Sequence, residues 1–295
     1  MRDRVEAVQA WFEGTFLGRI WQRLLEDEFL DRSVALAAKA FVSAFPAIIV
    51  VASFMPTSVR DSITSTLVHR MGVAGAGQRT IRDSLTTSDD VRRTTGVLGL
   101  IFTFYYVNSF VTALQRVYER AWKRPPPGAV TRYATGAAWL AALVAYFALL
   151  GGARAFIGGA SIELFAPLAL VLTVGVWTVS PWLMLRRHIR LRVLVPTGVL
   201  TGVAMAVYGA SASLWMPRTI SENQRQFGFF GVALALVTWL TGAATIILVS
   251  AHSGAVLAQE EGLAGRVIRG PDDTVLSARA PDRGSDSAVQ VQPEA

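Results

Sequence analysis

The chain has 295 residues, of which 52% are hydrophobic and only 17% are charged, and it carries a net charge of +7 with no cysteine. Soluble domains have about 25% charged residues, and without cysteine neither disulfides nor thiolate metal sites can form. Every Asp, Glu, Lys and Arg lies outside six stretches, which are 40–59, 94–115, 133–153, 164–185, 193–217 and 226–259. This confinement of charge argues against a soluble enzyme, a disordered protein and a disulfide-stabilised scaffold.

The N-terminal segment 1–32 is predicted to contain an amphipathic helix over residues 4–30. Apolar side chains recur there at three- and four-residue steps, at Val5, Val8, Phe12, Phe16, Ile20 and Leu24. Tryptophan beside arginine suits a helix that lies in the membrane interface. Packing on the loops of its own bundle is an equal alternative, because amphipathicity does not choose the partner. The segment mixes acidic and basic residues and lacks the apolar core of a cleavable signal peptide.

Six membrane-spanning helices are predicted, so the fold class expected is an all-α integral membrane protein, a six-transmembrane-helix bundle. A helix needs about 20 apolar residues to cross a bilayer, where lipid offers the backbone no hydrogen-bond partner. The predicted spans are 34–55, 95–115, 133–153, 165–185, 193–214 and 228–251. They form a domain over residues 33–258. The following tail, 259–295, is rich in Gly, Pro, Ser and Asp and is predicted to be disordered.

The distribution of Lys and Arg predicts that both termini are cytoplasmic. Segments 1–32, 116–132 and 186–192 hold five, five and four basic residues, whereas loops 154–163 and 215–227 hold one and two. The loop 56–94 holds six, but long loops obey the rule less strictly. This loop is therefore assigned to the outside. It carries two short helical patterns separated by Gly72, Gly75 and Gly77, and it is interpreted as a helical external loop.

No catalytic residue, cofactor site or metal site is predicted, and the protein is not expected to be an enzyme. His69, His188 and His252 lie on different segments without ligand spacing, and HExxH and GxSxG are absent. His252 is interpreted as a helix-end histidine near the lipid headgroups. The basic residues are arranged by membrane side rather than in one patch, which argues against a nucleic-acid partner. Membrane lipids are the expected partners, with a second copy of the chain or envelope proteins as further candidates.

Polar and kink-forming residues inside the predicted spans are the candidates for a pathway through the bundle. They are Lys39, Ser43, Pro46, Asn108, Ser109 and Gln115. Buried polar groups in lipid usually face the bundle. Hydrogen bonding between helices is the alternative role, favoured for Asn108, and snorkelling toward the interface is the alternative for Lys39. Ser43 is placed to bond a carbonyl freed by Pro46.

Two further patterns concern the helix ends and the packing between helices. Basic residues at the predicted cytoplasmic ends are candidates for contact with anionic headgroups, namely Arg116, Arg120, Arg186 and Arg187. The spacing of Gly198 and Gly202, four residues apart, predicts close packing of the fifth span against a neighbour.

Three segments in this order resemble the YihY/BrkB family of bacterial inner-membrane proteins. They are Ala40 to Pro46, ending in Ser-Ala-Phe-Pro; Ala113 to Tyr118, with Gln115 for the usual Asn; and Phe227 to Gly231, with Phe for the usual Tyr. The resemblance covers about residues 20–258. It implies an integral inner-membrane protein, linked in some members to envelope integrity, serum resistance and a proposed lipid or lipid-like transport. The family's former label as a ribonuclease has no motif to support it here. His252 stands where the family often has an acidic residue.

The residues and the resemblance together favour a transporter or translocator of lipid or lipid-like envelope substrates. A non-catalytic membrane scaffold for envelope integrity is the alternative, and an intramembrane enzyme ranks last because no catalytic cluster is present. A cavity between the first, second and last spans, lined by Ser43, Asn108, Ser109 or Gln115, favours transport. A closed, dry core counts against it.

Overall fold

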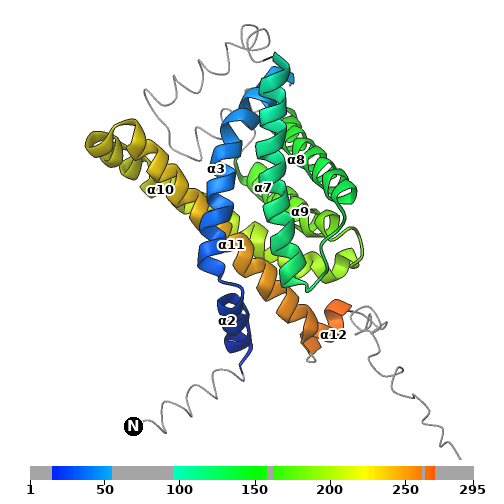
Figure 1. The fold of residues 1–295 in the computed structure, drawn as a ribbon. Coiled ribbons are helices and arrows are strands. Elements are labelled where there is room, and N and C mark those ends of the chain that lie inside the picture. Colours follow the sequence, from blue (N-terminus) through cyan, green and yellow to red (C-terminus); the bar gives the residue numbers. More distant parts are fainter. Residues whose placement is uncertain (1–14, 55–95, 158–161, 261–262, 270–295) are drawn as a thin grey trace, which may run out of the picture.

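The structure, a computed structural model, describes residues 15–54, 96–157, 162–260 and 263–269. Within these ranges every regular element is a helix (Figure 1). The helices are α2 (Phe16–Glu26), α3 (Phe29–Phe54), α7 (Gly96–Ala121), α8 (Ala129–Ile157), α9 (Ile162–Met184), α10 (Leu191–Phe227), α11 (Phe229–Gln259) and α12 (Leu263–Arg269). Residues 4–14 of the predicted N-terminal helix, the predicted external loop 56–94 and residues 270–295 of the tail lie outside the described residues.

Each predicted span coincides with one long helix, but the helices continue beyond the apolar stretches. The clearest difference is α10, which runs for 37 residues to Phe227, so the prediction of a loop over 215–227 is wrong. Arg218, Glu222 and Arg225 interrupt the apolar run there without interrupting the helix, because charged residues are good helix formers in water. Similarly, α12 lies within the tail that was predicted to be disordered.

Four helices are long and apolar enough to cross a membrane by length and composition. They are Ala129–Arg154, Phe165–Met184, Leu191–Phe227 and Phe230–Gln259. Their side chains are mostly exposed within the structure, with only 17 to 39% of the most apolar window buried. Such helices bury their apolar surface against lipid rather than against protein. The side chains of α3 and α7 are described only in part.

The segments predicted to be cytoplasmic lie at one end of the bundle. Figure 1 shows α2 and α12 together at the end where α11 finishes. The loops that follow α7 and α9 meet there, because Arg186 Nη2 donates a hydrogen bond to the Pro125 carbonyl at 3.3 Å. Arg192 Nη2 likewise donates to the Val267 carbonyl at 2.7 Å. These segments therefore share one side of the bundle.

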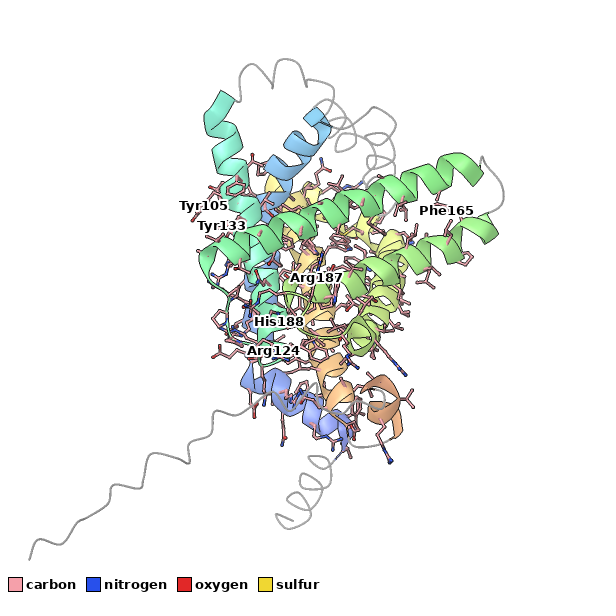
Figure 2. The ribbon with its side chains drawn as sticks, turned by 90° about the vertical axis from the view of Figure 1, so that its right-hand side faces the viewer. Tyr105, Arg124, Tyr133, Phe165, Arg187 and His188 are labelled. Carbon is pink, nitrogen blue, oxygen red and sulfur yellow. The ribbon has the colours of Figure 1, made fainter. Side chains whose placement is uncertain are left out.

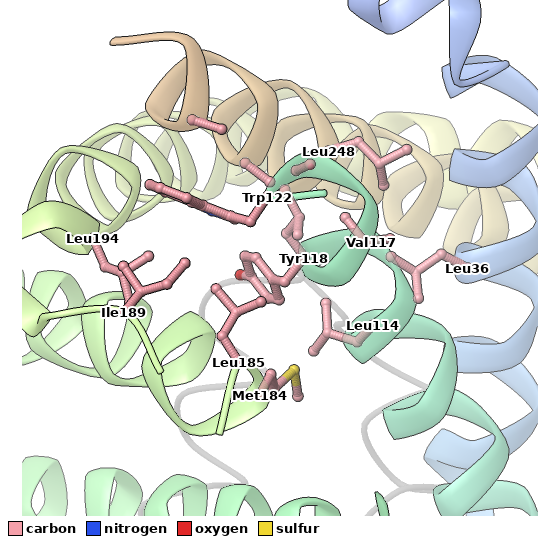
Figure 3. Close-up of a cluster of buried hydrophobic side chains, with 14 of the residues drawn as sticks. Leu36, Leu114, Val117, Tyr118, Trp122, Met184, Leu185, Ile189, Leu194 and Leu248 are labelled. Carbon is pink, nitrogen blue, oxygen red and sulfur yellow. The ribbon is translucent and has the colours of Figure 1, made fainter. Parts of the chain in front are cut away.

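The main hydrophobic core lies toward this same end of the molecule, and Figure 3 shows its side chains in close-up. It contains the last turns of α7, the loop between α9 and α10, and the second half of α11. Tyr118 is fully buried and Trp122 is 4% exposed, and both lie between these elements. Large aromatic side chains bury much apolar area, so this cluster fixes the ends of α7, α9 and α11 relative to one another.

A single glycine separates α10 from α11. Gly228 has φ +59° and ψ −135°, a conformation open to glycine but strained for residues with a Cβ. Three residues later, a Cβ on Gly231 would overlap the Asn223 backbone carbonyl. The Phe-Gly-Phe-Phe-Gly sequence at 227–231 therefore forms a tight helical hairpin, with both glycines required by the backbone.

Close helix packing at the predicted glycine pair is confirmed. A Cβ on Gly198 would lie 2.7 Å from Thr178 Cα, and one on Gly202 would lie 2.9 Å from Val174 Cα. Both contacts are to the backbone of α9, which cannot rotate away as a side chain can. These two glycines therefore let α10 approach α9 closely, as small residues do at helix interfaces in membranes.

We expect Gly198→Ala to destabilise the protein by about 1–3 kcal/mol, because the new methyl group overpacks the α9–α10 interface. The matched control is Gly175→Ala on α9, where a Cβ meets nothing within 4 Å. Thermal unfolding of both variants in detergent measures the effect. Equal midpoints for Gly198→Ala and Gly175→Ala would contradict the close approach of α9 and α10.

Candidate anion-binding site

A cavity of about 230 Å³ lies between α3, α7 and the start of α8. Its lining residues are Lys39 from α3, then Tyr105, Asn108, Ser109, Thr112 and Arg116 from α7, and Ala129, Arg132 and Tyr133 from α8. The α7 residues follow one another at three- and four-residue steps and so share one helix face. Figure 2 shows Tyr105 and Tyr133 beside each other on α7 and α8. We call this space the α8 cavity.

A second cavity of about 130 Å³ lies on the other side of the α3–α7 pair, against α11. It is lined by Asp27, Arg32, Ala35, Leu36, Lys39, Ala113, Arg116, Val117, Arg120, Leu248 and His252. Lys39 and Arg116 line both spaces. We call this second space the α11 cavity. The two shared cations therefore lie along the seam between α3 and α7, with a cavity on either side.

The α8 cavity is cationic. Lys39, Arg116 and Arg132 line it, and its lining includes no carboxylate. Within the described part of the chain, no carboxylate oxygen lies within 4.0 Å of a charged nitrogen of these three residues. Arg116 is exposed and Lys39 and Arg132 are half-buried, so these three positive charges create a positive potential in a space that is open to the outside.

The acidic side chain of Glu119 on α7 does not line this cavity. It is buried, and its Oε1 accepts a 2.9 Å hydrogen bond from Gln115 Nε2. Burial raises the pKa of the Glu119 carboxyl above its ordinary value, while the Gln115 hydrogen bond and nearby arginines, led by Arg132, act in the opposite direction. Glu119 lines a third cavity of about 160 Å³ instead, with Arg124, Arg186 and His188 among its walls.

Lys39, Asn108 and Ser109 are the sequence candidates that the structure brings together, and all three line the α8 cavity. Gln115 does not: it is 1% exposed, and its Nε2 also lies 3.4 Å from the Met184 carbonyl, joining α7 to α9. Ser43 is also buried, and it donates to the Ala40 carbonyl at 3.0 Å. The carbonyl that Pro46 frees is four residues before the proline, at Val42, so the expected Ser43 bond is wrong.

The candidate arginines separate into two groups. Arg116 lines both cavities and Arg120 lines the α11 cavity. Arg186 and Arg187 lie on the loop between α9 and α10, both with left-handed φ, near +57° and +58°. The Arg187 guanidinium lies over the Trp182 ring at 4.7 Å, a cation–π contact. Arg187 and His188 are labelled on this loop in Figure 2.

His252 is not a helix-end residue near headgroups, as the sequence suggested. It lies seven residues before the end of α11, and its side chain is 4% exposed. Its Nε2 lies 2.6 Å from Asp27 Oδ2, and its Nδ1 lies 2.9 Å from the Leu248 carbonyl. Both partners are acceptors when Asp27 is ionised, so both bonds form together only when each ring nitrogen carries a proton.

The Asp27 contact is one of several that hold α2 on α11. Arg19 pairs with Glu260 at 2.5 Å, and Arg23 Nη2 donates to Gln259 Oε1 at 2.6 Å. Ile20 and Leu24 are buried against Val256. A neighbouring face of α2 exposes Leu17, Trp21 and Leu25, at 66, 48 and 54%. One apolar face of α2 thus packs on the protein's own bundle, and the other apolar face remains free to lie in the membrane interface.

Sequence reasoning missed several cavity residues. Tyr105 and Thr112 lie on the same α7 face as Asn108 and Ser109, and their helical spacing was the available signal. Arg132 and Tyr133 had no such signal, because only tertiary packing brings the start of α8 to α7. Among the described residues no group of three His, Asp or Glu side chains is arranged to hold a metal ion.

The apolar helices and the all-helical architecture define an integral membrane protein with several spans. The family model for Virulence factor BrkB matches residues 20–272. The chain therefore belongs to the Virulence factor BrkB family, which confirms the resemblance drawn from its motifs. Neither a curated protein nor a solved structure matches the sequence.

We expect Asp27→Ala to loosen α2 and to destabilise the protein by about 1–3 kcal/mol, because it leaves the buried His252 Nε2 without its acceptor. The control is Asp31→Ala, which removes an exposed carboxylate one turn further along the chain. Thermal unfolding in detergent and the rate of proteolysis within α2 measure the two effects. Faster cleavage in Asp31→Ala than in Asp27→Ala would contradict the role of the Asp27–His252 pair.

Proposed function

We propose that this chain is a six-span protein of the bacterial inner membrane, with both termini in the cytoplasm, that translocates lipid or lipid-like envelope substrates. It acts by binding and moving its substrate, not by altering it chemically. The observation that carries the proposal is the α8 cavity, a cationic and hydroxyl-lined space between helices whose outer surfaces face lipid.

The lengths of α3 and α7 support six spans rather than four. Each has 26 residues, which corresponds to about 39 Å at about 1.5 Å per residue. The hydrocarbon core of a bilayer is about 30 Å thick. Both helices also pack within the bundle, α3 against α7 and α11. A location beside four apolar helices of similar length favours a transmembrane position for these two.

The position of the α8 cavity supports translocation more than a purely structural role. It opens between the first, second and third long helices, and Asn108 and Ser109 line it. The α11 cavity opens between the first, second and last long helices, where a pathway was expected, but none of the four expected polar residues lines it. A polar space beside lipid allows a headgroup to leave the interface without losing all its polar partners. The scaffold alternative draws on the buried hydrophobic cluster that joins α7, α9 and α11.

The proposed topology predicts the side from which single cysteines react. Because the chain has no native cysteine, Gly128→Cys, between α7 and α8, reports on the 116–132 segment alone. We expect a membrane-impermeant maleimide to label Gly128→Cys only from the cytoplasm and Gly75→Cys only from outside. The opposite pattern, measured in intact and permeabilised cells, would reverse the topology.

The proposed activity predicts faster transbilayer movement of labelled phospholipid in proteoliposomes than in empty liposomes. We expect the double variant Arg116→Gln/Arg132→Gln to slow this movement about tenfold, equivalent to about 1.4 kcal/mol of lost stabilisation. The double variant Arg154→Gln/Arg266→Gln, which removes two exposed arginine charges outside the cavity, is the charge-matched control. Movement no faster than in empty liposomes, with folded wild-type protein, would refute translocation of that lipid.

A further inference from the structure

Hydroxyl groups in the α8 cavity behave differently from those elsewhere in the helices. In α8 to α11 most Ser and Thr side chains donate to a carbonyl three or four residues earlier in their own helix, among them Thr135, Thr178, Ser180, Thr201, Thr241 and Thr245. Within the described structure, Ser109 and Thr112 make no such bond. The Asn108 amide makes no hydrogen bond to a described residue either. These three side chains are half-buried, and their unused donors and acceptors remain available to a ligand.

The cations of the same cavity are also available. The ammonium group of Lys39 and the guanidinium of Arg116 have no hydrogen-bond or ion-pair partner among the described residues. The Arg132 guanidinium has one contact, a 3.4 Å hydrogen bond to the Pro127 carbonyl. Arginine presents a planar set of donors that matches phosphate oxygens, and lysine adds a compact charge. Cations with free amide and hydroxyl groups between them form a recognition set for a phosphate group.

We propose that the α8 cavity is a binding site for the phosphate of an anionic lipid headgroup, and that it disfavours zwitterionic headgroups. The lining of the α8 cavity contains three cations and no carboxylate, so an ammonium group of a zwitterionic lipid would meet like charge there. The volume of about 230 Å³ is far above the ~10–15 Å³ that one water molecule requires. This inference deepens the proposed function by naming the substrate class of the same site.

The outer rim of the cavity favours a lipid over a free phosphate ion. Tyr105 is 66% exposed and Tyr133 is 49% exposed, and Phe104, 64% exposed, stacks on Tyr133 with ring centroids 6.1 Å apart. Exposed aromatic side chains beside basic residues are typical of the boundary between headgroups and acyl chains. A lipid that places its phosphate between Lys39 and Arg116 would lay its chains against this aromatic rim, whereas an inorganic ion has no use for it.

The test is binding, measured without transbilayer movement. Full-length protein in phosphatidylcholine nanodiscs is titrated with photoactivatable phosphatidylglycerol, and crosslinking is compared with photoactivatable phosphatidylcholine at the same density. We expect at least about tenfold preference for phosphatidylglycerol, and a loss of about tenfold in Arg116→Gln/Arg132→Gln, since each charge-assisted hydrogen bond contributes that much or more. Crosslinked peptides should map to α7 and the start of α8.

The controls separate the site from general surface charge. Arg154→Gln and Arg266→Gln each remove one exposed positive charge outside the cavity and should keep the preference. Arg116→Lys, which retains the charge, should bind more phosphatidylglycerol than the glutamine variant does. Such a recovery would show that the loss in the glutamine variant is not caused by misfolding. Equal crosslinking of both lipids, or equal losses in the control variants, would overturn the proposal.

A competition arm distinguishes the two sources of phosphate. Inorganic phosphate at millimolar concentration should leave the phosphatidylglycerol crosslinking unchanged, and full competition would overturn the lipid assignment in favour of a soluble anion. The outcome is independent of translocation. Selective binding without transbilayer movement would refute the proposed translocation but support the phosphate site. Transbilayer movement without selective binding would support translocation but refute the phosphate site.

Discussion

Lipid offers no water to a charged or polar group, and the arrangement of this protein follows from that constraint. The long helices expose apolar side chains to the surroundings, so the charged residues gather where helices end. Several chain segments meet at one such end, where an ion pair joins α2 to the end of α11 and a hydrogen bond joins α10 to α12. The main hydrophobic core includes residues from these helix ends.

The sequence predicted most of the helices because the absence of charge marks a membrane span strongly. It predicted their ends poorly, as α10 demonstrates: Arg218 and Arg225 end the apolar run at a place where the backbone simply continues as helix. Hydropathy reports which residues lipid accepts, whereas helix length depends on local backbone preferences and on turns such as Gly228. The close approach at Gly198 and Gly202 was predictable, since small residues four apart leave a visible pattern.

The candidate site was predictable only as far as single helices reveal it. Lys39, Asn108 and Ser109 were visible as polar residues within apolar runs, and they line one cavity. The contribution of Arg132 was not visible, because a basic residue at the start of a span looks like any other topology signal. The partner of His252 was equally hidden, since Asp27 lies 225 residues away in sequence. Pairings between distant segments depend on tertiary packing, which one sequence does not display.

The hairpin at Gly228 belongs to a tightly packed group of helices, α9, α10 and α11. Its one-residue turn, the contact of Gly231 with Asn223 and the glycine contacts of α10 with α9 leave these three helices no room to slide past one another. By contrast, α8 packs chiefly on α9 and much less on α7, although α7 and α8 together form the walls of the α8 cavity. The sparse α7–α8 contact therefore forms one wall of the cavity, with Arg116 on the α7 side and Arg132 on the α8 side.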